Sequence, residues 1–136
     1  MGVVIEAVYL GHKKARLRHA PSGAEFLTDV PRDAGGEASS FSPTDLVAGA
    51  LGTCMISVMG VAAERAGIDL AGTRMRVEKE MTGPPRRIGR LAVVVRMPAR
   101  LTAEERERLE RVARECPVLR SLHPDVTVDA QFLYDV

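Results

Sequence analysis

The stretch of residues 46–66 constrains the fold more than any other part of the chain. It contains no proline, and its first charged residue is Glu64. A helix that is apolar all round for about five turns must be buried on nearly every side. We therefore expect a long central helix that is covered by other elements or by a second copy of the chain.

Signals at both ends predict where this helix begins and ends. Ser42 supplies a capping hydroxyl, and Pro43 suits the first helical position. Asp45 is the acid three residues after the cap, and Gly67 is a typical C-terminal stop. Glycines inside the helix would normally weaken it, so they predict a close approach of another backbone, such as that of a symmetry mate. They are Gly49, Gly52 and Gly60.

Strand and helix patterns occupy the rest of the chain. Apolar or alternating segments predict strands over residues 3–10, 15–20, 24–30, 73–81, 88–97 and 126–134. Thr102 opens a second helix with a capping box, and the apolar positions of that helix recur up to Cys116. Pro117 is expected to end it. This order of elements predicts an α+β domain with antiparallel sheets packed on helices.

Length and charge narrow the class of protein. The 136 residues are expected to form one domain, residues 1–136. A formal net charge of +1 argues against a nucleic-acid-binding protein. The N-terminal segment lacks the basic leader of a signal peptide, and no segment predicts a membrane span in preference to a core helix. We expect a cytoplasmic protein with neither a nucleic-acid nor a membrane partner.

Cys54 and Cys116 are the residues most informative about function. They are the only cysteines in the chain, and each falls on an apolar helix position. Such a pair can be two inert core thiols, a structural disulfide, or a nucleophile with its resolving partner. The reducing cytosol makes the structural disulfide the least favoured of the three. The residues alone leave the other two open, because free cysteine is among the most buried residue types.

Motifs around the cysteines carry a resemblance to a known family. They are Ser42-Pro43-Thr44-Asp45-Leu46, Ala50-Leu51-Gly52-Thr53-Cys54 and Cys116-Pro117-Val118. In this order the chain resembles the OsmC/Ohr family of osmotically inducible and organic-hydroperoxide-resistance proteins. Two further segments are similar to a generic OsmC-like branch of it, Glu78-Lys79-Glu80-Met81 and Pro85-Arg86-Arg87-Ile88. The resemblance implies an intertwined homodimer with the Cys-bearing helices at its centre, and a thiol-dependent peroxidase without metal or haem.

The resemblance also implies roles for individual residues. Cys54 would attack the peroxide, and Cys116 would condense with the resulting sulfenic acid to a disulfide. The family's activating glutamate position falls on Thr44, with Asp45 one position later, and its arginine position falls on Lys14. A buried thiol needs a nearby cation to react, so Lys14 is the candidate activator and Asp45 a candidate partner in activation.

Both charged candidates have competing structural interpretations. Cys54 lies nine positions after Asp45, which puts the two on opposite faces of a regular helix and favours capping over activation. Lys14 lies in a charged strand region, where a solvated face is the default. The alternative cations are Arg16, Arg18 and, from a partner chain, Arg87.

The favoured prediction is a thiol-dependent peroxidase that reduces hydroperoxides in oxidative-stress defence. It needs an external thiol, dithiol or redox protein as reductant and no cofactor, and the apolar residues around Cys54 favour organic hydroperoxides. The three histidines share no metal-ligand spacing with one another or with the cysteines, so no metal site is expected. The alternative is a non-catalytic dimer that binds an apolar small molecule in the same groove, with the cysteines as passive lining.

Overall fold

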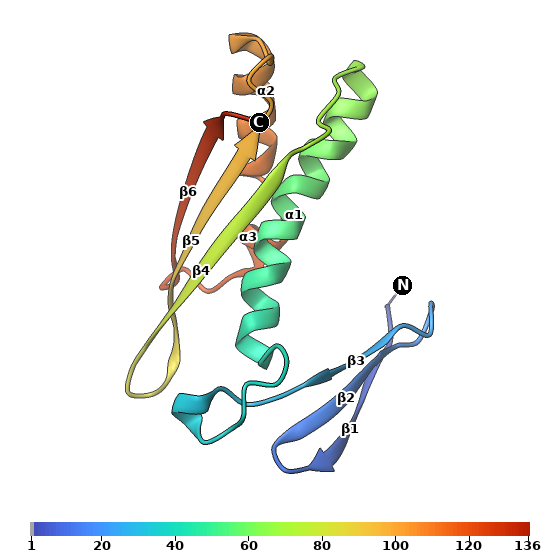
Figure 1. Ribbon diagram of the computed structural model, residues 1–136, viewed down its shortest axis with the longest axis vertical. Coiled ribbons are helices and arrows are strands. Elements are labelled where there is room, and N and C mark those ends of the chain that lie inside the picture. Colours follow the sequence, from blue (N-terminus) through green and yellow to red (C-terminus); the bar gives the residue numbers. More distant parts are fainter. Residues whose placement is uncertain (1) are drawn as a thin grey trace. The chain divides into compact units, whose positions relative to one another are not determined.

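The structure, a computed structural model, describes residues 2–136 and contains two three-stranded sheets (Figure 1). The chain divides into an N-terminal unit that ends at Leu46 and a C-terminal unit that begins at Val47. Strands and helices are both present, so the predicted α+β class is confirmed. The assignment of residues 1–136 to one domain stays a prediction.

The N-terminal unit is built on an antiparallel sheet. Its strands are β1 (Ile5–Gly11), β2 (Lys14–His19) and β3 (Glu25–Thr28), in the order β1-β2-β3. The short 3-10 helix η1 (Arg32–Ala34) lies in the loop that follows β3. All three strands fall where the sequence predicts them, within one or two residues at most ends.

The long helix α1 (Pro43–Ala66) begins and ends as predicted. The Ser42 Oγ accepts a hydrogen bond from the Asp45 backbone N–H at 3.1 Å, and an Asp45 carboxylate oxygen accepts one from the Ser42 N–H at 2.9 Å. This reciprocal pair is a capping box. Gly67 adopts a φ of 68°, the left-handed geometry that stops a helix.

The sheet of the C-terminal unit is mixed, which corrects the prediction of antiparallel sheets throughout. Strands β4 (Arg74–Thr82) and β5 (Arg87–Met97) form an antiparallel hairpin, whereas β6 (Thr127–Tyr134) pairs with β5 in parallel. The chain crosses from β5 to β6 through two helices, α2 (Ala103–Ala113) and α3 (Pro117–Ser121). A crossover of this kind is what parallel neighbours require.

The apolar core of the C-terminal unit joins α1, β5 and α2. Alternate residues of β5 are buried, as expected for a sheet with one covered face. In Figure 1, α1 runs along the sheet on the side where this core lies. The largest fully buried apolar side chains are Leu51, Met55, Met59, Leu91, Val93, Val95, Met97 and Leu109.

The glycines of α1 have different surroundings within the chain, and the predicted close approach of a symmetry mate's backbone stays a prediction. A Cβ on Gly52 would lie 2.5 Å from the Sδ of Met75, so this glycine makes room for a side chain of β4 in the same chain. A Cβ on Gly49 or Gly60 would meet nothing within 4 Å. Of the three, only Gly52 is needed for packing within the chain.

Much of α1 remains uncovered by its own chain. Its most apolar 18-residue window has a mean hydropathy of 2.0, and 33% of that window is buried. By length and composition alone, α1 is the one helix among residues 2–136 that could cross a membrane. Core helices of soluble proteins have the same length and composition, so this feature is weak evidence for a span.

Candidate functional site

The two cysteines come together in the C-terminal unit. Both are free thiols; Cys54 on α1 is partly buried, and Cys116 is fully buried at 0% exposure. Cys54 packs against the apolar core that contains Cys116, and it is among the influences on the pKa of the Cys116 thiol. The structure thus brings together two residues that are 62 positions apart in sequence (116 − 54).

Cys116 lies outside the second helix, which corrects the prediction that it belongs to that helix's apolar face. Helix α2 ends at Ala113, and Cys116 is the N-cap of α3. Its Sγ accepts a hydrogen bond from the Leu119 backbone N–H at 3.4 Å. The cause is Pro117, which holds the preceding residue in extended geometry (φ −63°, ψ 145°) and opens a new helix at its first position.

The environment of Cys116 favours its neutral form. Burial is the main cause that raises the pKa of the Cys116 thiol, and the Cys54 hydrogen bond and charge raise it further. The Leu119 N–H works in the opposite direction, since it stabilises a thiolate. The net effect is a raised pKa, so Cys116 is kept as a thiol beside the more exposed Cys54.

An apolar groove follows α1 beyond Cys54. Its volume is about 380 Å³, and it is lined by Ser57, Val58, Val61, Ala62, Arg65 and Val112. The first five lie three, four, seven, eight and eleven positions after Cys54. Residues at these spacings share one face of a helix, so the groove continues the face that carries the Cys54 thiol.

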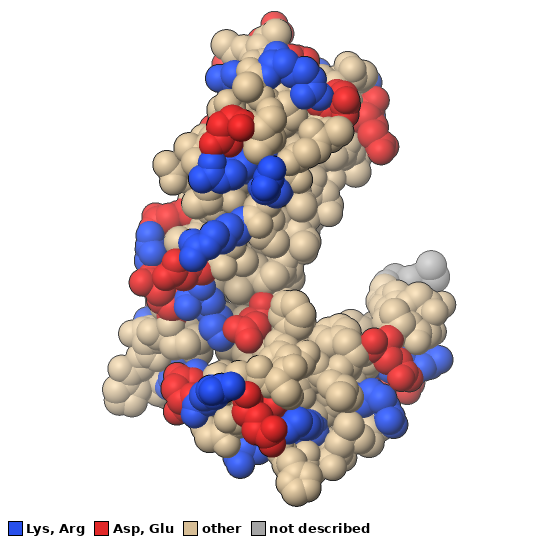
Figure 2. Space-filling view, in the orientation of Figure 1, with Lys and Arg blue, Asp and Glu red and all other residues tan. Residues whose placement is uncertain are grey.

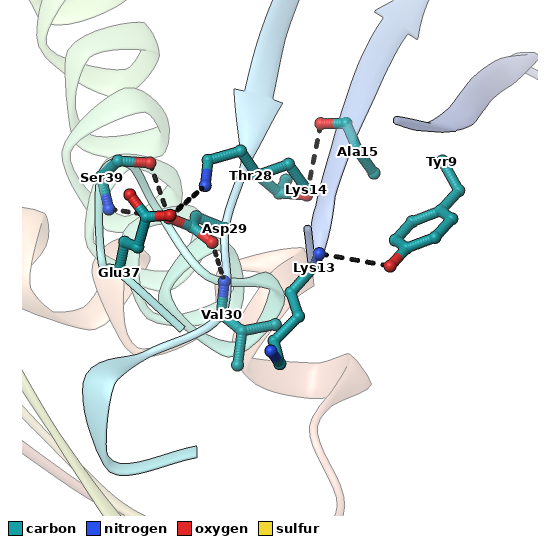
Figure 3. A network of polar contacts seen from close by, with 9 residues as sticks. All are labelled: Tyr9, Lys13, Lys14, Ala15, Thr28, Asp29, Val30, Glu37 and Ser39. Carbon is teal, nitrogen blue, oxygen red and sulfur yellow. Dashed lines mark hydrogen bonds and ion pairs between the residues drawn. The ribbon is translucent and has the colours of Figure 1, made fainter. Parts of the chain in front are cut away.

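Lys14 is held by two carboxylates within the N-terminal unit (Figure 3). Its Nζ lies 3.2 Å from the Glu37 Oε1 and 3.6 Å from the Asp29 Oδ2. The hydrogen bond to Glu37 is the main cause that raises the pKa of Lys14, and the Asp29 charge adds to it. Lys14 is therefore a fixed cation with 24% of its side chain exposed.

The buried partner, Asp29, is a polar residue that the sequence analysis missed. Its carboxylate is 1% exposed and accepts hydrogen bonds from the Val30 N–H at 2.8 Å, the Ser39 N–H at 3.0 Å and the Ser39 hydroxyl at 2.6 Å. The Ser39 hydroxyl is the main cause that holds the pKa of Asp29 well below its usual range. The available signal was an acid near the end of a predicted strand (residues 24–30), ahead of a glycine-containing loop.

The remaining candidates occupy structural positions. Asp45 lies in the capping box of α1, as the sequence favoured. Arg18 pairs with Glu25 at 3.8 Å, and Arg87 donates to the Ile88 carbonyl at 3.1 Å. Over residues 2–136 no group of three or more His, Cys, Asp or Glu side chains could hold a metal ion.

The chain belongs to the OsmC-like protein family, whose model matches residues 36–131. A solved structure from Psychrobacter arcticus 273-4, whose name refers to osmotic stress and detoxification, is 32% identical to it. That likeness covers 97% of each chain with a TM-score of 0.91. No protein in a search of curated proteins matches the chain.

Two more distant structures share the fold. The organic hydroperoxide resistance protein OsmC of Legionella pneumophila is 21% identical over 98% of this chain and 97% of its own, with a TM-score of 0.78. The organic hydroperoxide resistance protein OhrB of Bacillus subtilis is 18% identical over 97% of this chain and 98% of its own, with a TM-score of 0.70. The fold expected from the cysteine motifs is therefore confirmed.

Proposed function

We propose that this protein is a thiol-dependent peroxidase that reduces organic hydroperoxides in oxidative-stress defence. Its relatives include organic hydroperoxide resistance proteins, which supports a peroxide-related stress role. The observation that carries the finer proposal is the pair of neighbouring free thiols with unequal exposure, Cys54 partly buried and Cys116 fully buried. Two nearby thiols that differ in exposure suit the roles of an attacking nucleophile and its resolving partner.

Cys54 is proposed to react first because its thiol is the more accessible of the two. The Cys54 thiolate attacks the distal peroxide oxygen, an S–O bond forms, and the O–O bond breaks. The departing oxygen takes up a proton and leaves as an alcohol. Cys54 is then a sulfenic acid, the first and reversible step of thiol oxidation.

Cys116 is proposed to resolve that sulfenic acid. Its sulfur attacks the Cys54 sulfur, an S–S bond forms, and the hydroxyl leaves as water with the proton of the Cys116 thiol. The raised pKa of Cys116 keeps it protonated until its oxidised neighbour appears. An external thiol or dithiol then reopens the disulfide by two exchange steps, and is itself oxidised to a disulfide.

The apolar groove supports an organic peroxide over hydrogen peroxide. It lies on the α1 face that carries Cys54, and Val58, Val61 and Val112 supply much of its wall. An apolar substituent placed there would leave water, with a gain of about 25 cal/mol per Å² of buried apolar surface. Hydrogen peroxide has no such group.

Lys14 is proposed as the cation that favours the reactive thiolate. Its support is the match to the family's arginine position and its fixed charge. Asp45 is retained as a candidate for the acidic site residue, although its capping box already explains its presence. We assign neither a metal nor an organic cofactor.

A homodimer in the cytoplasm is the proposed working state. The low burial of α1 in its own chain supports an assembly, because an exposed helix of this hydropathy is costly in water. Large apolar side chains of β1, such as Val8 at 53% and Tyr9 at 70% exposure, add uncovered surface. The proposed partners are a second copy, the hydroperoxide and the thiol reductant, with no nucleic acid and no membrane.

Single-cysteine variants test the proposal. We expect Cys54→Ser to lose peroxide reduction, whereas Cys116→Ser completes one turnover and leaves Cys54 as a sulfenic or over-oxidised acid. Mass spectrometry after one equivalent of cumene hydroperoxide measures both outcomes. Wild-type rates in Cys54→Ser would contradict the proposal.

A second candidate function is binding of an apolar small molecule without catalysis. The observation that favours it is the same groove of about 380 Å³, with apolar residues along most of its length. Thiol titration of the native protein separates the two functions. A peroxidatic Cys54 is modified quickly near neutral pH and consumes peroxide stoichiometrically, whereas a passive thiol reacts only after denaturation.

A further inference from the structure

A hollow lined by three arginines lies on the sheet of the C-terminal unit. Its volume is about 320 Å³, and its lining residues are Arg74, Met75, Arg76, Val94 and Arg96. Buried residues of β5 alternate with Val94 and Arg96, so these two point away from the apolar core. None of the described residues that line this arginine hollow is a carboxylate.

The strand register places two of these arginines directly opposite each other. Arg74 of β4 is the Cα partner of Arg96 of β5. Like charges directly opposite across two strands are destabilising. No hydrogen bond or ion pair to any residue in the described part of the chain engages the Arg74 side chain. This charge therefore lacks a partner, and an added anion would remove the repulsion.

The other two arginines leave room for a further acceptor. Arg76 contacts Glu78 at 3.4 Å, a long distance for a charge-assisted hydrogen bond, and the two side chains are 75% and 57% exposed. Arg96 pairs with Asp135, and both of these side chains are nearly half exposed. Exposed pairs of this kind contribute little. The three guanidinium groups thus have only two carboxylate partners, and both of these ion pairs are exposed and weak.

The opposite end of the same sheet face shows the usual arrangement. There Arg90 is the Cα partner of Glu80, with 2.8 Å between Nη1 and Oε2, and its Nε lies 2.7 Å from the Asp129 Oδ2. The hydrogen bond to Glu80 is the main cause that raises the pKa of Arg90. Figure 2 shows basic and acidic side chains interspersed along this part of the molecule. Charge complementarity is thus the pattern of the face, and the arginine hollow departs from it.

We propose that the arginine hollow binds a small organic oxyanion, a phosphate or phosphate ester in chemical class. Arginine presents a rigid fork of donors that matches two oxygens of such a group, which favours a phosphate oxyanion over a single-atom anion. Val94 lines the hollow with apolar surface and would contact the carbon part of an ester. The volume exceeds that of one water-sized group many times over, so an organic substituent fits beside the phosphate. This site is independent of the thiol chemistry proposed above.

Titration with phenyl phosphate at low salt tests the proposal, with inorganic phosphate as a second probe that lacks the apolar part. Isothermal titration calorimetry is expected to detect binding of phenyl phosphate to the wild-type protein, weaker binding of inorganic phosphate, and loss of affinity as salt is added. Arg74→Gln is expected to weaken phenyl phosphate binding by about ten-fold or more, because one charge-assisted pair is lost. Arg74→Lys keeps the positive charge but loses the forked donors of the guanidinium. Its affinity for phenyl phosphate is expected to lie between those of the wild-type protein and Arg74→Gln.

Arg90→Gln is the matched control, because it removes one arginine from the same face at a site that already has its carboxylates. Its affinity is expected to match the wild-type value within about two-fold. Equal weakening by Arg74→Gln and Arg90→Gln would show a general surface-charge effect and overturn the site. Absence of binding to the wild-type protein at millimolar phenyl phosphate would also overturn it. Far-UV circular dichroism of each variant confirms that the comparison is made between folded proteins.

Discussion

The two units of this chain are stabilised in opposite ways. Among the described residues, the buried apolar side chains lie in the C-terminal unit, from Ala48 to Cys116. The buried polar and charged residues are Thr28, Asp29 and Ser42, and all three lie in the N-terminal unit. One unit therefore depends on apolar packing, and the other on a hydrogen-bonded carboxylate with its lysine.

This difference separates the ingredients of the proposed chemistry. The thiols sit in an apolar interior that favours the neutral form of Cys116. The candidate cation, Lys14, is held in the polar network of the N-terminal unit. The two thiols and the candidate cation thus lie in different units of the chain, so substitutions in the two units should give different kinds of defect.

The largest effect is expected from the apolar interior. Met55→Ala removes a fully buried side chain of α1 and should lower the free energy of unfolding by about 2–5 kcal/mol. Val61→Ala on the same helix changes a side chain that is 51% exposed, so its effect should be well below that. Urea denaturation measures both, and equal losses would contradict the account of this core.

Gly52 should show a smaller effect that depends on β4. Gly52→Ala places a Cβ 2.5 Å from the Met75 Sδ, and we expect a cost of about 1–3 kcal/mol from overpacking. Adding Met75→Ala should make the Gly52→Ala change nearly neutral, because the clash is removed. A double-mutant cycle measures this coupling. Additive effects would show that the cost of Gly52→Ala does not come from Met75 and arises at a contact with a partner chain.

The stability of the N-terminal unit should depend on pH through the buried carboxylate of Asp29. The pKa of Asp29 is lowered on folding, so its stabilising contribution is present above the unfolded value near 3.8 and is lost as pH falls from there through the folded value. Asp29→Asn should lower thermal stability at neutral pH and flatten its fall below about pH 4. Glu6→Gln, at an exposed site, is the control. A variant with an unchanged pH profile would remove Asp29 from this role.

The smallest and most specific effect concerns Lys14. If its charge favours the reactive thiolate, Lys14→Met shifts the alkylation of Cys54 to higher pH with little loss of stability. Lys13→Met is the matched neighbour, and Asp45→Asn should weaken the helix cap without moving the alkylation profile. An unchanged profile in Lys14→Met would transfer the role to Arg16, Arg18 or Arg87. A large shift of the alkylation profile in Asp45→Asn would show that Asp45 also influences the Cys54 thiol.

Local signals were enough to predict most of the fold. Helix α1 carries its own start and stop signals, and the alternating segments of β4 and β5 are long, so their positions follow from sequence. The parallel pairing of β6 could not be predicted in this way, because it depends on the path of the crossover from β5. The N-cap position of Cys116 was missed because helical spacing was extended three residues past the true end of α2.

The candidate site also has a part that the sequence predicts and a part that it does not. The cysteines were identified from their motifs, and the structure places Cys54 against the apolar core that contains Cys116. The contacts of Asp29 with Lys14 and Ser39 join residues 15 and 10 positions apart, respectively, and no local pattern marks such pairs. Burial of a carboxylate is a tertiary property, so this network is visible only after folding.

The most direct test of the account is the state of the cysteines after one peroxide dose. The native wild-type protein, treated with one equivalent of cumene hydroperoxide without reductant, should contain a single intramolecular Cys54–Cys116 bond in non-reducing peptide mass spectrometry. The loss of two thiol hydrogens from the chain and the release of one cumyl alcohol should accompany it. Two intact thiols with unconsumed peroxide, or oxidation of Cys54 with Cys116 left as a thiol, would contradict the account.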